Sequence, residues 1–436
     1  MMKRYLQKFC PKNGYLKKIE QLPLEQRWRQ VRAWMDTESL SLYEELRESC
    51  PVLELPELTI VTRFSDCTSV LRQYDVFSVA LYKPKQSDFW MSQDDTAIHW
   101  REKAIMRSVL DLEQLASTRQ YVAAKASSLL HNAQGTIDVV GGLCRAVSIA
   151  FVQEQFGFDK SDPNDLFEWS YWSQYDAFHN QAFDSVVVKD PTQIVANREA
   201  AGQNLGVYLI KLIQRRGAEL KVGKDNNDPA TRLLKLSMSG ALEKFDPARV
   251  IRNLGGLLIG TVETTSHAAI NALVELFERP EILKQAIAAA QKDDPSEFDG
   301  YVLEALRFNP SLPYFFRVCE QETQLATGTD YACTIKPGTT VIAITHSAMF
   351  DETAFPQPQV FDPTRPETNT FHFGQGLHEC LGRHIGRQMI TELVRQVLLL
   401  PGVKAVSKVD YKGGPFPEEY RLEWCHEELR ALFYLR

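Results

Sequence analysis

One cysteine stands in a run of residues whose types and spacing favour metal chemistry. Residues 373–382 read FGQGLHECLG, so Cys380 lies among glycines and two residues after His378. Gly374 and Gly376 allow backbone conformations that residues with a Cβ avoid, and they let the chain approach a flat ligand closely. Backbone N–H groups around Cys380, with a helix that begins after it, would favour a thiolate over a thiol. The run therefore predicts a thiolate presented on a rigid loop.

A thiolate held in this way is suited to be the axial ligand of a haem iron. The competing interpretation is a buried structural cysteine, and for a cysteine standing alone that interpretation would be preferred. The run resembles the haem-binding loop of the cytochrome P-450 family at each defining position, namely Phe373, Gly374, Gly376, His378, Cys380 and Gly382. The resemblance covers the chain roughly from Pro51 to the end. It implies haem b (iron protoporphyrin IX) as the cofactor and O2 as co-substrate.

A second group of residues combines one acid with two arginines. Glu304 and Arg307 are three positions apart, so they share a helix face and can pair in a bidentate manner. An isolated pair of this kind is usually a solvated helix face. Here Arg365 follows in the segment FDPTR, and the resemblance implies a buried network of the three residues that supports the haem loop. Its role would be structural, and loss of one partner would be costly.

The third group lies in a long apolar helix, in the segment Gly260-Thr261-Val262-Glu263-Thr264-Thr265. Neighbouring hydroxyls in a helix favour bonds back to carbonyls and local distortion. From the residues alone, an ordinary helix face with one charge is the better interpretation. The resemblance implies instead an acid–alcohol pair, Glu263 and Thr264, that delivers protons during dioxygen activation. Thr261 departs from the family, where a second glycine is usual.

The haem propionates would need cationic or hydrogen-bonding partners. The resemblance assigns this role to Arg317 and His378, and to His99 with Lys103, where the family commonly has His-x-x-x-Arg. Lysine keeps the charge but lacks the planar fork of arginine. His99 taken alone would more often be an ordinary surface histidine.

Aromatic residues gather in three regions that the resemblance places around the substrate. Core packing is the default explanation for each ring. Together they predict an apolar, partly aromatic cavity. Its expected lining is Tyr82, Phe89, Trp90, Gly260, Thr261, Tyr314 and Phe315.

Helical periodicity dominates the sequence, and a small β component is expected near the N-terminus and in residues 310–345. The resemblance implies a mainly α fold with a small β-rich part, the cytochrome P-450 fold. Expected helices are Gln114–His131, Gly202–Arg216, Pro247–Glu278, Glu281–Gln291, Tyr301–Phe308 and Arg383–Leu400; expected strands are Leu58–Thr62 and Thr339–Ile344. Asp246-Pro247 predicts a helix start, and Arg279-Pro280 predicts a stop.

The bulk composition fits a globular enzyme of 436 residues, 44% hydrophobic and 24% charged. A net charge of −7 gives no reason to expect nucleic-acid binding. Eight scattered cysteines indicate reduced thiols in a cytoplasmic protein, with neither a disulfide framework nor a zinc site. No apolar run is long enough for a transmembrane anchor. Residues 1–50 are expected to form a basic, solvated arm and a first helix, and residues 51–436 a single catalytic domain.

These observations predict a haem-thiolate monooxygenase that inserts one atom of O2 into a hydrophobic small molecule, which can be aromatic. Electrons would come from NAD(P)H through a separate ferredoxin and ferredoxin reductase, because the chain offers no flavin or iron–sulfur segment. A basic patch for that partner would comprise Arg101, Arg107, Arg383 and Arg387. A monomer is expected. The alternatives are a peroxide-driven oxygenase, an oxygen-independent haem-thiolate isomerase or dehydratase, and a non-catalytic haem- or ligand-binding protein.

Overall fold

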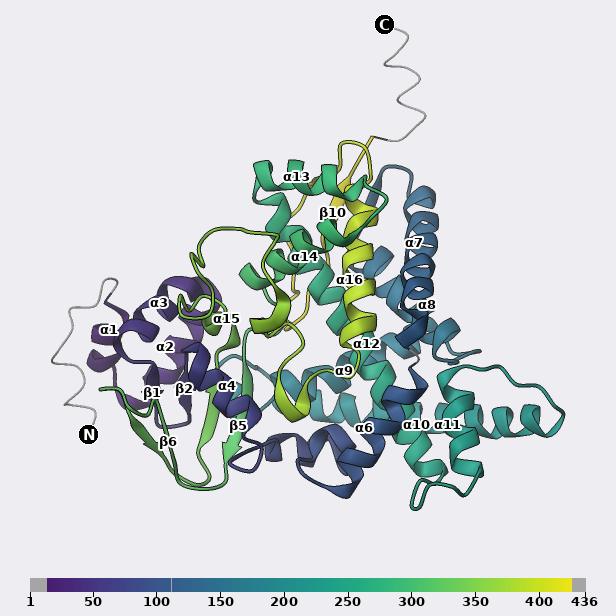
Figure 1. The fold of residues 1–436 in the computed structure, drawn as a ribbon, viewed down its shortest axis with the longest axis horizontal. Helices are drawn as coiled ribbons and strands as arrows, with labels where there is room; N and C mark the ends of the chain where they lie inside the picture. Colours follow the sequence, from purple (N-terminus) through teal and green to yellow (C-terminus); the bar gives the residue numbers. More distant parts are fainter. Residues whose placement is uncertain (1–13, 111, 426–436) are drawn as a thin grey trace, which may run out of the picture.

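The computed structural model describes residues 14–110 and 112–425. Helices form most of it, and a smaller part with the first helices and the main sheet lies at the left of Figure 1. The α-helices are α1 (Tyr15–Gln21), α2 (Leu24–Thr37), α3 (Ser39–Ser49), α4 (Phe64–Arg72), α5 (Lys83–Gln86), α6 (Ala97–Val109), α7 (Leu115–Asn132), α8 (Ala146–Gln155), α9 (Pro163–His179), α10 (Pro191–Lys221), α11 (Pro229–Met238), α12 (Pro247–Phe277), α13 (Pro280–Ala290), α14 (Ser296–Phe308), α15 (Thr345–Ala348) and α16 (Arg383–Leu398).

The strands form three sheets. They are β1 (Val52–Glu54), β2 (Thr59–Val61), β3 (Phe77–Ser78), β4 (Thr136–Asp138), β5 (Phe315–Cys319), β6 (Thr323–Leu325), β7 (Cys333–Ile335), β8 (Thr340–Ala343), β9 (Lys404–Ala405) and β10 (Arg421–Glu423). The largest sheet has the order β1-β2-β8-β5-β3, in which β2 and β8 are parallel and the other pairs antiparallel. This sheet brings β5, which carries Arg317, beside β8.

Four consecutive long helices share one starting signal, an aspartate followed by proline. The aspartate accepts a backbone N–H from the first turn, and proline at the first helical position has no N–H to leave unpaired. The expected start of α12 at Asp246-Pro247 is confirmed, since Asp246 accepts from the Arg249 amide at 3.0 Å. The same signal opens α9, α10 and α11 at Asp162, Asp190 and Asp228.

The expected elements are confirmed with small shifts at their ends, except that α14 begins at Ser296, five residues before the predicted start, and that α10 is much longer than the predicted 202–216. Its additional turns begin at Asp190-Pro191, a signal that the apolar periodicity alone did not reveal.

Helix α12 is the central element of the helical part and packs on α9, α10, α14 and α16. Its residues from Val262 to Ala272 are almost continuously buried, as expected for a helix that is surrounded on most sides. A second apolar cluster joins α1–α3 to the sheet through residues such as Trp28 and Phe316.

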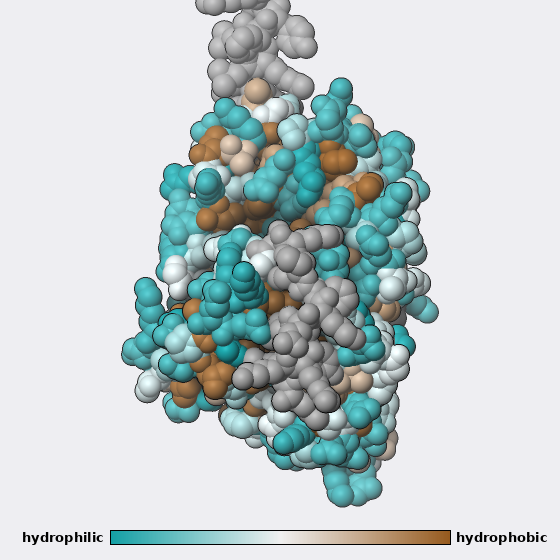
Figure 2. Space-filling view, turned by 90° about the vertical axis from the view of Figure 1, so that its left-hand side faces the viewer, coloured by the Kyte–Doolittle hydropathy of each residue, from teal (hydrophilic) through white to brown (hydrophobic). Residues whose placement is uncertain are grey.

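The solvated arm expected at the N-terminus is wrong for the part that the structure describes. Tyr15, Leu16 and Ile19 are each at most 5% exposed, because α1 packs its apolar face on α2 and α3. Residues 1–13 lie outside the described chain. Figure 2 views this side of the molecule, where hydrophilic and hydrophobic residues are interspersed. The proposed boundary near residue 50 falls between the end of α3 at Ser49 and the start of β1 at Val52.

Candidate active site

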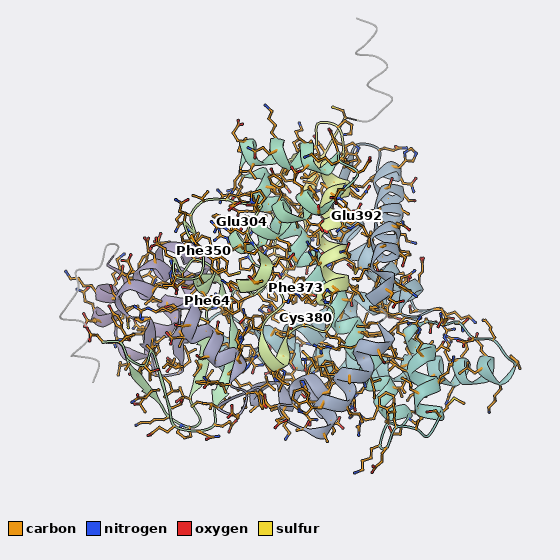
Figure 3. The ribbon with its side chains drawn as sticks, in the orientation of Figure 1. Phe64, Glu304, Phe350, Phe373, Cys380 and Glu392 are labelled. Atoms are coloured by element: carbon orange, nitrogen blue, oxygen red, sulfur yellow. The ribbon has the colours of Figure 1, made fainter. Side chains whose placement is uncertain are left out.

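The glycine-rich loop lies between the sheet and α16, near the middle of the molecule (Figure 3). Gly374 and Gly376 have φ angles of 67° and 74°, which is the left-handed region that favours glycine. A Cβ at Gly376 would stand 2.6 Å from the backbone oxygen of Leu71, so the loop also needs glycine there for close packing. The amide of Cys380 donates to the carbonyl of Phe373 at 2.8 Å, and this bond closes the loop. The sequence thus fixes the cysteine on a rigid support.

Cys380 is exposed although the segments on both sides of it are packed. Surrounding protein raises the pKa of its thiol, whereas the backbone N–H of Gly382 and the charges of Lys103 and Arg383 act in the opposite direction. The N-terminus of α16 begins three residues later, as the sequence predicted. The thiol is therefore available to a ligand and lies among groups that would stabilise its anion.

Open space also occurs beside the middle of α12. Gly260 is exposed, and no other atom lies within 4 Å of the position that a Cβ would take there. Thr264 donates to the carbonyl of Gly260 at 2.6 Å, and Thr261 donates to that of Leu257 at 2.7 Å. These bonds are the back-bonding that neighbouring hydroxyls predicted. The side chain of Thr261 reduces the open space beside α12, compared with the second glycine that is usual in the family at this position.

The side chains of Glu263 and Thr264 have different partners. Its carboxylate pairs with Arg145 at 2.9 Å, and Arg145 also pairs with Glu418 at 2.8 Å. Glu263 is 1% exposed, and burial raises its pKa to about 7 although Arg145 acts to lower it. One carboxylate oxygen, Oε1, has no hydrogen-bond partner among the described residues. The structure therefore holds this acid against Arg145, without a hydrogen bond to the neighbouring threonine.

Arg317 is a buried cation without a carboxylate partner among the described residues. It is 5% exposed, it donates to the carbonyl of Phe316 at 2.8 Å, and burial lowers its pKa. Burying an unpaired charge is costly, so this position favours an anionic ligand.

Two histidines and a tryptophan form a cluster of rings beside the glycine-rich loop. The rings of His99 and His378 meet edge to face at 5.2 Å, and the ring of Trp90 meets His99 at 5.3 Å. Nδ1 of His99 lies 3.0 and 2.9 Å from the carbonyls of Trp90 and Gln93, which assigns it a proton. Nε2 of His99, Nδ1 of His378 and the indole N–H of Trp90 are buried and have no hydrogen-bond partner within residues 14–110 and 112–425.

Asp94 completes this group. Its carboxylate lies 3.0 Å from Nε2 of His378 and also accepts the amide of Val79. Burial lowers the pKa of His378 to about 4 although Asp94 acts to raise it, so the ring is neutral near neutral pH. Lys103 is 6% exposed and donates from Nζ to the carbonyl of Leu377 in the loop. That bond ties α6 to the loop and leaves Lys103 two further N–H donors.

The expected network of one glutamate and two arginines is present in the structure. Glu304 accepts two bonds from Arg307, at 2.8 and 2.9 Å, and one from Arg365 at 3.2 Å. The Asp362 amide donates to the same carboxylate at 3.0 Å, and Arg307 donates further to the carbonyls of Met349 and Pro358. Both carboxylate oxygens of Glu304 therefore accept hydrogen bonds, as a buried ion pair requires.

Some of the expected pocket residues are buried in the core, and others are partly or fully exposed. Tyr82 is 7% exposed and stacks on Phe316 with a centroid distance of 4.6 Å, while Trp90 is 1% exposed. Phe89 fills the space beside Gly256 on α12. Tyr314 and Phe315 are partly exposed, as are Gly260 and Thr261.

Sequence reasoning missed Arg145, Asp94 and Phe416. Phe416 contacts Tyr171 and Tyr175 of α9 and the rings of His179 and His267. No local motif marks these three residues. Arg145 and Phe416 come from segments distant in the sequence, and Asp94 lies between Trp90 and His99 but meets His378 only in the folded chain. The aromatic run of α9 was the available signal for part of this cluster.

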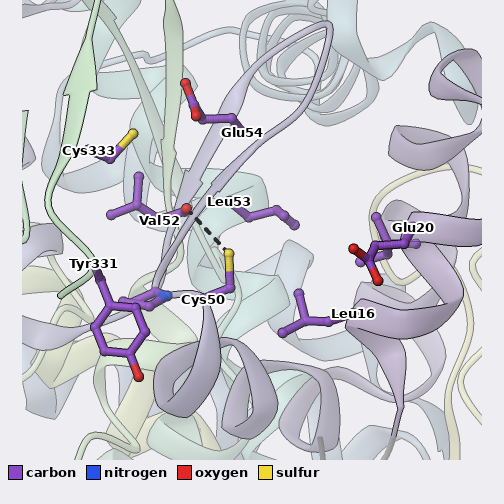
Figure 4. A pocket seen from close by; sticks show the side chains of 10 residues that line it. Leu16, Glu20, Cys50, Val52, Leu53, Glu54, Tyr331 and Cys333 are labelled. Atoms are coloured by element: carbon purple, nitrogen blue, oxygen red, sulfur yellow. Dashed lines mark hydrogen bonds between the residues drawn. The ribbon is translucent and has the colours of Figure 1, made fainter. Parts of the chain in front are cut away.

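Two cavities lie outside this loop. One of about 40 Å³ is lined by Leu16, Cys50, Val52, Tyr331 and Cys333 among others (Figure 4). The other, of about 140 Å³, is polar and borders the Glu304 network. Within residues 14–110 and 112–425 no group of three or more His, Cys, Asp or Glu side chains is arranged to hold a metal ion, and no helix is long and apolar enough to cross a membrane.

The residues around the loop fit haem b. An accessible thiol can serve as the axial ligand, and the unpaired guanidinium of Arg317 and indole N–H of Trp90 can bind carboxylates. The two neutral histidines can become donors when an anion raises their pKa. A single thiol beside unpaired cationic and N–H donors suits a ligand that carries both a metal and two carboxylates.

Comparisons with known proteins agree with this geometry. A profile of the cytochrome P-450 family matches residues 143–407. A C-19 steroid 1alpha-hydroxylase of Sorangium cellulosum is 30% identical over 229 residues, which span 51% of this chain and 52% of that protein. The putative cytochrome P-450 YjiB of Bacillus subtilis is 22% identical and is matched over 84% of this chain and 88% of its own length.

Solved structures show the same fold. The crystal structure of CalO2 superposes with a TM-score of 0.76 at 17% identity and covers 90% of this chain and 97% of its own. The family profile covers more than half of the sequence, and the mainly helical fold with its small sheets is that of the same proteins. The chain therefore belongs to the cytochrome P-450 family.

Proposed function

We propose that this cytochrome P-450 is a monooxygenase that inserts one atom of O2 into a hydrophobic small molecule. The observation that carries the proposal is the accessible thiol of Cys380 on a left-handed glycine loop, together with the buried cation Arg317, which acts electrostatically on His378 of the same loop. When bound, haem supplies the activation of dioxygen, with one oxygen atom passing to the substrate and the other to water.

Cys380 would hold the haem through its sulfur, and Phe373, Gly374 and Gly382 would shape the loop around it. Arg317 would bind a propionate, because a carboxylate there removes the cost of an unpaired buried charge. His99 and His378 would bind the propionates after gaining a second proton, and Asp94 would stabilise the cation formed at His378. Lys103 would hold α6 against the loop and direct its remaining donors to the same carboxylates.

Thr264 and Glu263 would manage protons on the opposite side of the site. The hydroxyl of Thr264 is held by the carbonyl of Gly260, so its position beside the open stretch of α12 is defined. A pKa of about 7 lets Glu263 both accept and release a proton near neutral pH. Arg145 and the partly exposed Glu418 connect this carboxylate towards solvent.

The substrate would occupy the space next to Gly260 and Thr261, with Tyr314 and Phe315 as partly exposed aromatic walls. Phe315 reaches within 3.9 Å of the position of a Cβ at Gly374, so this wall adjoins the haem loop. Apolar and aromatic surfaces favour a hydrophobic molecule, including one with an aromatic ring.

A separate ferredoxin with its reductase would deliver electrons from NAD(P)H in the cytoplasm. Three of the four arginines expected in the docking patch already have carboxylate partners, since Arg101 pairs with Glu102, Arg383 with Glu379, and Arg387 with Glu367. The fourth, Arg107, is exposed and acts electrostatically on Lys103 beside the loop. We therefore place the main attraction for an acidic partner at Arg107.

The experiment uses the full chain loaded with haem, a surrogate ferredoxin and its reductase. Reduced protein under carbon monoxide should show the red-shifted Soret band of thiolate ligation, and NADPH should drive oxygen uptake. Compounds that shift the haem spin state would then be tested for oxygenated products. Thiolate ligation without NADPH-driven oxygen uptake would contradict the monooxygenase, and product formed only with added hydrogen peroxide would favour the peroxide-driven alternative.

A further inference from the structure

A buried glutamine joins α9 to the part of α12 that carries the proposed acid–alcohol pair. Gln174 of α9 is 4% exposed, and its side-chain N–H donates to the carbonyl of Ile259 at 2.5 Å. The hydroxyl of Ser170, one turn earlier on α9, lies 3.5 Å from the same oxygen. Ile259 directly precedes the open Gly260. The contact therefore falls beside the open stretch of α12 that the proposed function assigns to the substrate.

The bond from Gln174 matters because the Ile259 carbonyl is also an acceptor in the backbone ladder of α12. In an α-helix the oxygen of residue i accepts the amide of residue i+4, so the helical partner of the Ile259 oxygen is the amide of Glu263. Gln174 shares that oxygen with the residue proposed to supply protons. An inserted side-chain donor of this kind bends a helix locally.

Neighbouring carbonyls of the same turn also accept side-chain donors. Thr261 bonds to Leu257, and Thr264 bonds to Gly260. Both of these bonds lie within α12 and would survive a movement of the whole helix. The bond from Gln174 comes from another helix, so it fixes the turn relative to the rest of the site.

Helix α9 is itself firmly held on its other side. Asp176, two residues beyond Gln174 and 1% exposed, pairs with Lys85 of α5 at 2.7 Å and with Arg198 of α10 at 3.1 Å. These ion pairs link α9 to α5 and α10, so Gln174 connects α12 to a helix that has partners of its own on another face.

We propose that Gln174 is a positioning residue that sets the placement of Glu263 and Thr264 for proton delivery. Its role is to donate one N–H to the Ile259 carbonyl from a fixed helix, and it does not touch the reacting atoms. The proposal rests on the function proposed above for the acid–alcohol pair. It requires a donor at this position, so leucine or methionine of similar size cannot replace glutamine.

The first test measures amide hydrogen exchange in Gln174→Leu and, should that variant fold poorly, in Gln174→Met. Loss of one buried hydrogen bond should speed exchange of residues 260–264 about fivefold relative to the unchanged protein. Both termini of α12 should exchange as before. Gln181→Leu is the control, because its buried amide donates to Ala177 of α9 and its side chain caps the 3-10 helix Ala182–Val186, so this variant loses buried hydrogen bonds at the end of α9 and keeps the bond from Gln174 to Ile259. Unchanged exchange at 260–264 in the Gln174 variants would overturn the proposal.

The second test measures hydrogen peroxide formed per NADPH in the haem-loaded protein without added substrate. Two electrons and two protons reduce O2 to hydrogen peroxide, and four of each reduce it to two waters. Water forms only if the O–O bond breaks, which requires a proton placed on the departing oxygen, so misplaced proton delivery raises the peroxide yield. Gln174→Leu should raise this yield, Gln181→Leu should not, and Gln174→Leu should add nothing in a Thr264→Ala background.

The outcomes of the second test separate the two proposals. An additive effect in the double variant, or an equal rise in Gln181→Leu, would show a general structural disturbance and refute the positioning role. If Thr264→Ala leaves the peroxide yield unchanged, the acid–alcohol function fails. The exchange result would still show whether Gln174 holds the turn.

Discussion

Replacing Glu304 with glutamine tests the buried network most directly, because the change preserves the shape of the side chain, removes its charge and turns one accepting oxygen into an N–H donor. Arg307 is 1% exposed and stacks between Phe308 and Phe350, at 4.4 and 4.5 Å from the two ring centroids. It cannot reach solvent when its carboxylate partner is lost. Breaking a buried ion pair in this way costs about 3–5 kcal/mol, since the remaining charge stays buried without compensation.

The expected thermal shift follows from the size of the chain. Unfolding entropy of about 2.1 cal/mol/K per residue gives about 0.9 kcal/mol/K for 436 residues. A loss of about 3–5 kcal/mol should therefore lower Tm by about 3–6 °C, with the whole chain unfolding as one unit. Calorimetry of the haem-free protein, followed by haem titration, measures the shift and the effect on haem uptake.

The control is Glu297→Gln on the same helix, α14. Glu297 pairs with Lys292, and their side chains are 52% and 54% exposed, so this surface pair contributes at most about 1 kcal/mol. If Glu304→Gln lowers Tm no more than Glu297→Gln, the buried network does not stabilise the fold and the prediction is refuted. Normal haem uptake by Glu304→Gln would separately refute its support of the haem loop.

Four further predictions concern the site itself. Cys380→Ala should abolish the thiolate Soret band of the carbon monoxide complex, and a retained band would remove Cys380 as the ligand. Thr264→Ala should keep haem binding and the substrate-induced spin shift but raise hydrogen peroxide per NADPH, and slow product formation about a hundredfold if proton delivery is its role. Arg317→Met should raise the Tm of haem-free protein, because an unpaired buried cation is removed, and should speed haem loss to a scavenger protein; a fall in Tm would show a hidden partner for Arg317. Burial raises the pKa of Glu263 from its ordinary 4.5 to about 7, so the folded protein keeps a proton that the unfolded chain releases in this interval. Its contribution to stability therefore falls as pH rises from about 4.5 to about 7 and is flat above that range. Glu263→Gln should flatten the fall of Tm over this window, and an unchanged pH profile of Tm would contradict the shifted pKa.

Local sequence information was sufficient for the loop and for most helices. The glycines at 374 and 376 predicted a backbone that only glycine adopts readily, and both have positive φ angles. Asp246-Pro247 predicted the start of α12, because a cap and a proline act within one turn. The i, i+3 spacing of Glu304 and Arg307 likewise fixed their contact on one helix face. Each of these properties depends on residues within a few positions of each other.

Side-chain partners across the fold could not be predicted in the same way. The sequence could not show that Glu263 pairs with Arg145, 118 positions earlier, or that Asp94 meets His378 across 284 positions. It also misjudged residues 15–19, whose basic neighbours suggested a solvated arm although Tyr15, Leu16 and Ile19 are buried. The apolar face of α1 is buried only when α2 and α3 pack against it.

The sequence by itself indicated the family and the cysteine loop, and it predicted the acid, hydroxyl and arginine residues of the proposed site, because these are encoded by residue type and short spacing. Only the tertiary structure decided that Arg317 lacks a carboxylate partner among the described residues, that Glu263 is held by Arg145, and that Gln174 donates to the Ile259 carbonyl of α12. The physical reason is that burial and long-range pairing set the cost of each charge. Those quantities depend on which segments the fold brings together.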